Sequence, residues 1–275
     1  MNLIEWTKMW DDKIKEWSSN PDLYFKNDNI YKAYKSLDVN SELIKNAIPE
    51  PYIGDVNSKC SAVVLSLNPG QLLMEDQQVL PDGEFIKDGA AENFSEWAKK
   101  WFYLTYEKDT FWKNRKAWLD RRVSDKNKEL YPFGIELIPY HSKAWGKLDS
   151  NETVLEYVEN NVLVVAEEMT KQCVLKFVFC FGKPYYNMFK NLKYEEILKI
   201  DNNNYQEFTK EWPVENGRLI NRTYIIWKSP RDKFYLQTYA PGGFKAPKEE
   251  FIGIENAIMQ EIQKRYGCTL EGENI

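Results

Sequence analysis

The chain has 275 residues, of which 43% are hydrophobic and 29% are charged, so it is long enough to bury a core of its own. Its formal net charge of −5, from 37 basic and 42 acidic residues, excludes the overall basic balance of a strong duplex-DNA binder. No apolar run approaches the roughly 20 residues of a membrane-spanning helix, and the N-terminus shows no signal-peptide pattern, so we expect a cytoplasmic protein.

The four cysteines are dispersed and form no CxxC pair. They are Cys60, Cys173, Cys180 and Cys268. We expect buried free thiols in a reducing compartment. With this dispersal and only one histidine, we expect no metal site, and nothing in the chain indicates a cofactor.

The N-terminal part of the chain is expected to be helical. Apolar residues recur at spacings of three and four from Leu3 to Trp17, which is typical of one buried helix face. We treat residues 1–48 as a helical extension. Pro49-Glu50-Pro51 then ends the helical structure and leads into an extended stretch.

Strands and helices alternate through the rest of the chain. Apolar runs rich in β-branched and aromatic residues predict strands at 62–67, 134–140, 174–181, 223–228 and 234–239. Helical spacing predicts helices at 94–102, 111–122, 149–169 and 251–266, with a short one from Pro184 and a C-cap at Gly267. Residues 193–217 are polar and are interpreted as an insertion.

This order predicts one α/β domain over residues 1–275. We expect three layers, α/β/α, around a central and mainly parallel sheet of four or five strands. Ligands of such sheets bind beyond the carboxyl ends of the strands. The segments that follow the predicted strands begin at Asn68, Pro139, Gly182, Ser229 and Ala240.

The segment Val64-Leu65-Ser66-Leu67-Asn68-Pro69-Gly70 resembles the first motif of the uracil-DNA glycosylase superfamily, in its mismatch-specific branch, where a hydrophobic strand runs into an Asn-Pro-Gly turn. The family's second motif is a Pro-containing loop after a late strand that contacts the minor groove. Ser229-Pro230-Arg231 or Ala240-Pro241-Gly242-Gly243 takes that place here, and neither has the usual His-Pro-Ser or Asn-Pro-Ser form.

The resemblance implies a protein that binds a flipped base in single- or double-stranded DNA and cleaves its N-glycosidic bond. Asn68 would position the attacking water, and His141 would donate a hydrogen bond to the leaving base. We expect the strands that precede these two residues to be adjacent in the sheet, so that their side chains can converge. The base would contact Pro69, Gly70, Gln71, Phe85 and Phe94. Nucleic acid would meet Lys143, Ser229, Pro230, Arg231, Pro241, Gly242, Gly243 and Lys245. The surface rim near Arg115, Lys143, Arg231 and Lys245 should then be positive.

Each feature also has a structural interpretation. Asn-Pro-Gly is a common turn sequence, and a lone histidine is often a satisfied polar residue. Helical spacing alone explains Phe94, and the basic run at 113–122 is typical of a solvated helix face. Two further functions therefore stay open: an inactive or repurposed member of the fold that binds nucleic acid, a nucleotide or a protein, and a small-molecule hydrolase or transferase on a generic α/β sheet.

Overall fold

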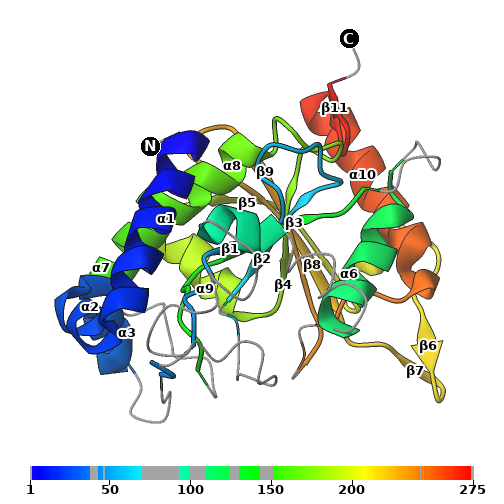
Figure 1. Ribbon diagram of the computed structural model, residues 1–275. Helices are drawn as coiled ribbons and strands as arrows, with labels where there is room; N and C mark the ends of the chain where they lie inside the picture. Colours follow the sequence, from blue (N-terminus) through cyan, green and yellow to red (C-terminus); the bar gives the residue numbers. More distant parts are fainter. Residues whose placement is uncertain are drawn as a thin grey trace. The chain divides into compact units, whose positions relative to one another are not determined.

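The computed structural model describes residues 2–37, 43–45, 47–67, 69, 93–99, 110–123, 130–142, 151–241, 243 and 245–273. The chain has a mixed α/β fold in which helices flank a central sheet (Figure 1). Seven strands form this sheet, in the spatial order β1 (Tyr52–Ile53), β3 (Phe133–Glu136), β2 (Val63–Ser66), β4 (Val178–Phe181), β9 (Phe234–Tyr239), β8 (Thr223–Lys228) and β5 (Glu195–Asp201). The prediction of an α/β fold with a helix-flanked central sheet is confirmed.

The sheet has more strands than the four or five that the sequence predicts. β4 and β9 pair in parallel, whereas β1 with β3, β9 with β8, and β8 with β5 are antiparallel. The strand β1 has only two residues, too few to show a period. The strand β5 lies within the segment predicted as a polar insertion. It is the last strand in the spatial order of the sheet, and it contains both exposed and buried residues. A polar composition is therefore compatible with its pairing to β8.

The same polar segment also contains a small hairpin. It joins β6 (Val214–Glu215) to β7 (Arg218–Leu219) in antiparallel register. Asn216 and Gly217 form its turn with φ values of 52° and 75°. Two positive φ values are what a type I′ hairpin turn requires, and Asn-Gly is the pair that adopts them most easily.

Contacts divide the chain into two compact units, each assembled from three segments. Unit 1 comprises Met1–Ser58, Val64–Glu107 and Phe133–Met169. Its helices are α1 (Leu3–Ser19), α2 (Pro21–Asn27), α3 (Asn29–Leu37), α7 (Glu152–Tyr157), the π-helix η3 (Val158–Leu163) and α8 (Val164–Met169). The first helix packs against α2 and α8, and α3 packs against α7.

The helix α1 forms as its sequence predicts. Asn2 accepts a hydrogen bond from the Glu5 backbone N–H and donates its own backbone N–H to the Glu5 side chain, a capping box. The apolar stripe from Leu3 to Trp17 is buried. Burial of such large aromatic surfaces supplies most of the stability of a helix with this amphipathic pattern.

Unit 2 comprises Lys59–Val63, Lys108–Pro132 and Thr170–Ile275. Besides β4, β9, β8 and β5 it contains α6 (Thr110–Asp120), α9 (Pro184–Asn191), η4 (Tyr205–Glu207), η5 (Glu249–Phe251), α10 (Ile252–Tyr266), β10 (Cys268–Thr269) and β11 (Gly272–Glu273). Pro184 opens α9, and Gly267 ends α10 with a φ of 69°, as the sequence predicts. Trp118 of α6 packs edge-on against Phe179 and Phe181 of β4.

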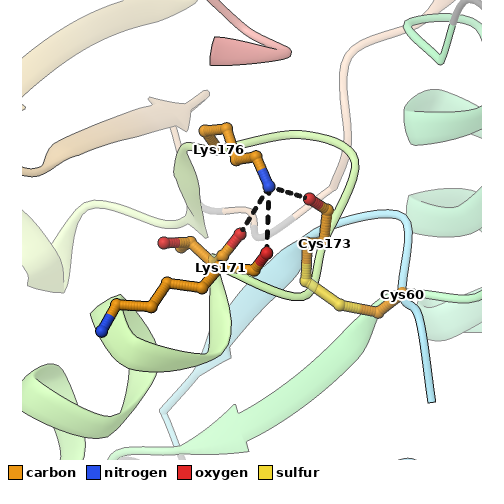
Figure 2. Close-up of a disulfide and its surroundings, with 5 residues drawn as sticks. Cys60, Lys171, Cys173 and Lys176 are labelled. Carbon is orange, nitrogen blue, oxygen red and sulfur yellow. Dashed lines mark hydrogen bonds between the residues drawn. A yellow bond between two sulfur atoms is a disulfide. The ribbon is translucent and has the colours of Figure 1, made fainter.

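A disulfide joins Cys60 to Cys173 within unit 2 (Figure 2). The prediction of free thiols is therefore wrong for this pair, and it is confirmed for the buried Cys180. The two cysteines form a parallel β-bridge that brings their Cα atoms to 4.5 Å, although 113 residues separate them. No short sequence motif indicates a disulfide between two cysteines that lie so far apart in the chain.

Lys176 forms hydrogen bonds with the backbone of the turn that contains Cys173. Its ammonium group donates to the backbone oxygens of Thr170, Lys171 and Cys173, at 3.3, 3.1 and 2.6 Å (Figure 2). Among the described residues, no helix has the length and apolarity needed to cross a membrane. The cytoplasmic location stays a prediction.

Candidate functional site

The ends of β2 and β3 meet at one edge of the sheet. The Leu137 backbone N–H donates to the Ser66 oxygen at 2.9 Å, and that of Ile138 donates to the Leu67 oxygen at 3.0 Å. These bonds continue the pairing just past both strands. The prediction that the strands preceding Asn68 and His141 are neighbours is therefore confirmed.

His141 is buried at this edge and is paired with Glu50. Its Nε2 lies 3.2 Å from Glu50 Oε1, and the two residues are 1% and 3% exposed. A carboxylate can only accept, so Nε2 is the protonated nitrogen in this hydrogen bond. Backbone bonds hold both residues in place, because Glu50 N–H donates to the Pro139 oxygen and the His141 oxygen accepts from Ile44 N–H.

The other ring nitrogen of His141, Nδ1, differs from Nε2 in its surroundings. Nδ1 is buried and has no hydrogen-bond partner among the described residues. It accepts from a base N–H or a water in the neutral ring, and it donates to a base oxygen in the imidazolium. Buried polar atoms without partners are uncommon in folded proteins, so this nitrogen marks a place where a ligand or water completes the structure.

Further polar side chains are buried around these strand ends. Ser66 and Glu136 are each 4% exposed, and Ser142 is 1% exposed. The Ser66 hydroxyl has no hydrogen-bond partner in the described ranges. Burying a hydroxyl without a partner costs free energy that an apolar residue would not, so Ser66 favours a site for a polar ligand over a purely structural strand end.

Aromatic residues surround Tyr140, which precedes His141 in the chain. The Tyr140 hydroxyl lies 3.3 Å from that of Tyr24, and the rings of Phe25 and Tyr31 contact the Tyr140 ring edge-on. Burial raises the pKa of the Tyr140 phenol, and the nearby carboxylate of Asp28 acts in the same direction. Tyr140 therefore keeps its proton at neutral pH. It can form hydrogen bonds, but it does not act as a general acid.

A cavity of about 710 Å³ opens among α1, α2 and the start of α3 in the same unit. Tyr24 lines it, together with Glu16, Asn20 and Asp28, and Asp28 pairs with Lys13 at 3.6 Å. The volume lies in the range of small-molecule sites. Two carboxylates against one ammonium give the lining no positive excess, so it fits a neutral polar ligand better than a phosphate.

The structure describes only some of the residues predicted for the site. Asn68, Gly70, Gln71, Phe85, Lys143 and Gly242 lie outside the described residues. Pro69 is partly exposed. Phe94 is 1% exposed and packs against Tyr52 and Trp97, in agreement with the core interpretation, and it offers no open ring face to a base.

The two candidates for the second motif lie at opposite ends of β9. Ser229–Lys233 is the turn between β8 and β9: the Ser229 hydroxyl accepts from the backbone N–H groups of Arg231 and Lys233, and Arg231 donates to the Tyr194 hydroxyl. Ala240–Gly243 follows the other end, and about 20 Å of a six-residue strand separates them. Both cannot serve one site, and the carboxyl-end rule favours Pro241 and Gly243.

The basic helix face predicted at 113–122 is only partly a solvated one. Arg115 is 1% exposed, and its guanidinium lies 3.0 Å from the Phe111 ring centre and 4.7 Å from that of Phe181. The Arg115 side chain is buried because its contacts with apolar neighbours contribute more than the hydration of its charge. The expectation that Arg115 belongs to a positive surface rim is wrong. Lys245, by contrast, is exposed.

Glu50 is a residue of the candidate site that was not predicted from the sequence. It stands between two prolines, which indicated only the end of a helix. The sequence contained one chemical indication of this role. A buried glutamate needs a polar or charged partner, and the single histidine of the chain was a candidate for that partner. In the described ranges no three His, Cys, Asp or Glu side chains cluster as metal ligands would, and the expected absence of a metal stays a prediction.

The chain matches no family model, no curated protein and no solved structure. Any assignment of function therefore depends on the geometry of the site.

Proposed function

We propose that the chain is a uracil-DNA glycosylase-like protein that binds a flipped base of single- or double-stranded DNA at the shared edge of β2 and β3. One observation supports this most directly: the hydrogen bonds from Leu137 and Ile138 to Ser66 and Leu67 pair the ends of these strands. Asn68-Pro69-Gly70 continues β2 along the chain, and His141 follows β3 at the same edge.

The chemistry at this edge suits N-glycosidic hydrolysis. In the proposed mechanism the Asn68 amide holds a water beside the sugar, and backbone N–H groups after Pro69 face the oxygens of the departing base. Glu50 fixes the orientation of the His141 ring through Nε2, so that Nδ1 is aimed at the base. Asparagine is a poor base, so the rate gain comes from orientation and from polar groups already in place.

A second candidate is a binding module of the same fold without catalysis. The burial of His141 to 1% exposure favours it, because such a ring meets a base only if the base enters deeply. The net charge of −5 also favours a short or single-stranded ligand over a long duplex. The cavity of about 710 Å³ among α1, α2 and the start of α3 has a size that suits a small molecule, but it involves none of the motif residues, so the small-molecule hydrolase or transferase is the third candidate.

The test is base release from end-labelled oligonucleotides. Substrates contain one uracil, one hypoxanthine or one mismatched thymine, in single and double strands, and abasic sites are revealed by alkaline cleavage. An oligonucleotide with paired thymine is the control. Release of one of the three bases supports the glycosylase. Tight binding of every strand without release supports the binding module, and neither binding nor release would falsify the proposed function.

A further inference from the structure

Three arginines converge in unit 2. Arg121 and Arg122 directly follow α6, and Arg222 directly precedes β8 (Figure 1). All three lie close to the Tyr224 phenol: burial raises the pKa of Tyr224, and the positive charges of the three arginines oppose that rise. Arg222 also donates to the Thr238 hydroxyl at 3.2 Å, near the end of β9.

Among the described residues, one carboxylate pairs with this cluster. Glu255 of α10 is ion-paired with Arg122 and accepts from Trp118 Nε1 at 2.9 Å and from the Tyr224 hydroxyl at 3.0 Å. Within the described part of the chain no ion pair joins Arg121 or Arg222 to an acid. Counted over the described residues, three positive charges and one negative charge leave an excess of two.

Arg121 and Arg222 donate to neutral oxygens instead. Arg222 donates to the backbone oxygen of Lys245 at 3.3 Å, and Arg121 donates to that of Pro247 at 3.3 Å. The Nε atoms of both arginines are buried and have no hydrogen-bond partner among the described residues. The cluster therefore holds spare donors together with spare positive charge.

Two members of the cluster are shielded from water. Arg222 is 6% exposed, and the Arg122 side chain is 9% exposed. Burial lowers the pKa of Arg222. Uncompensated cations in such surroundings are costly, so the excess charge calls for an anion.

Aromatic rings orient the guanidinium groups. Arg122 lies 3.6 Å from the Trp118 ring centre, and Arg222 lies 5.3 Å from that of Phe251. Contacts of this kind hold the plane of a guanidinium and leave its edge of N–H donors for hydrogen bonds to an oxyanion. Arg121 is only partly buried, so it is the member of the cluster that is most accessible to a ligand.

We propose that Arg121, Arg122 and Arg222 bind a phosphomonoester group. A phosphomonoester carries about −1.5 to −2 at pH 7, which matches the excess of two, and it has three oxygens for the spare donors. A monoester at a chain end reaches buried donors more easily than a diester does, because a diester is flanked on both sides. Its source is either a free nucleotide or the 5′-phosphorylated end of a strand.

A purely structural role accounts for part of the geometry. The arginines fasten the segment 245–247 through its backbone oxygens. This explains two hydrogen bonds, but it requires neither the excess charge nor the two Nε atoms without partners. The inference is independent of the proposed function, because it needs no base release and uses other residues.

Isothermal titration with methyl phosphate and dimethyl phosphate tests the site in the full chain. We expect methyl phosphate to bind and dimethyl phosphate to fail. Arg121→Gln and Arg222→Gln should each weaken methyl phosphate binding roughly tenfold or more, the scale of one lost hydrogen bond to a charged group. Arg218→Gln, an exposed arginine on β7, is the matched control and should bind as wild type.

The source of the phosphate is tested in a second arm. Adenosine monophosphate is titrated directly, and labelled oligonucleotides with a 5′-phosphate or a 5′-hydroxyl are compared by fluorescence anisotropy. Binding of the nucleotide, or a preference for the 5′-phosphate that Arg121→Gln removes, supports the site. Arg121 is partly exposed, so its variant should keep the wild-type circular dichroism spectrum. A folded Arg121→Gln protein that binds methyl phosphate as wild type, or a wild type that binds no monoester, overturns the proposal.

Discussion

The imidazole of His141 and the carboxylate of Glu50 form a buried pair, with Nε2 and Oε1 3.2 Å apart. Glu50 precedes β1 and His141 follows β3, so the contact joins chain positions 91 residues apart. Each residue is also fixed by a backbone hydrogen bond. The pair therefore connects the segment before the sheet to the edge where the proposed base site lies.

Removing the Glu50 carboxylate should destabilise the fold. In Glu50→Ala the His141 ring loses the partner of Nε2 while it stays buried, and one unsatisfied buried group costs about 1–3 kcal/mol. Urea unfolding followed by tryptophan fluorescence measures the change. The control is Glu207→Ala, an exposed residue of η4, which should stay within about 0.5 kcal/mol of wild type. Equal midpoints for both variants would show that the pair contributes nothing to stability.

Breaking the disulfide should cost more. Cys60 and Cys173 are 113 residues apart, and closing a loop of that size stabilises a fold by about 4–5 kcal/mol when the unfolded chain is constrained. We expect Cys173→Ser to lower the unfolding midpoint in urea, and reductant to lower that of wild type. Reductant should leave the variant unchanged, which is the internal control. Alkylation of unfolded, unreduced protein should spare the peptides with Cys60 and Cys173, and their full modification contradicts the bond.

The sequence predicts those parts of the fold that local chemistry determines. The stripe from Leu3 to Trp17, the strand around Val64 and the C-cap at Gly267 each follow from a pattern within one element. The strand β5 was missed because its place at the end of the sheet, and not its own composition, allows it to pair. The disulfide was missed because it depends on a contact between distant segments.

The same division holds for the candidate site. That Asn68 and His141 follow neighbouring strands could be predicted, because carboxyl ends of adjacent strands meet. The partner of His141 could not, since nothing in the local sequence of Glu50 indicates which residue it will face. The excess charge of the arginine cluster was hidden for a similar reason: Arg222 is separated by 100 residues from Arg122, within a chain whose overall charge is negative.

Binding of single-stranded DNA should weaken with salt, and it should depend on the basic residue at only one end of β9. Lys245 is exposed beyond the carboxyl end of β9, whereas Arg231 lies in the turn at its other end. We expect affinity for a fluorescent single-stranded oligonucleotide to fall between 50 and 200 mM salt, because released counterions drive such binding. Lys245→Gln should reduce the slope of log affinity against log salt by about 0.7, the value for one phosphate contact. Arg231→Gln should leave it unchanged, and an affinity that ignores salt would contradict nucleic-acid binding.

Base release, finally, should depend on Asn68 and His141 in different degrees. Asn68→Ala should abolish release of uracil from a labelled oligonucleotide while the protein still folds and binds, because a water that is not positioned attacks too rarely. His141→Ala should lower the single-turnover rate by roughly 10²-fold or more, the scale of one positioned hydrogen bond or proton donor. The His141 variant also loses the partner of Glu50, so His141→Gln is measured beside it as a variant that keeps a donor toward the carboxylate. If His141→Gln restores the urea midpoint and leaves the rate low, the ring acts on the base. If it restores both, His141 serves only to hold the edge of the sheet, and the binding module becomes the better account of this chain.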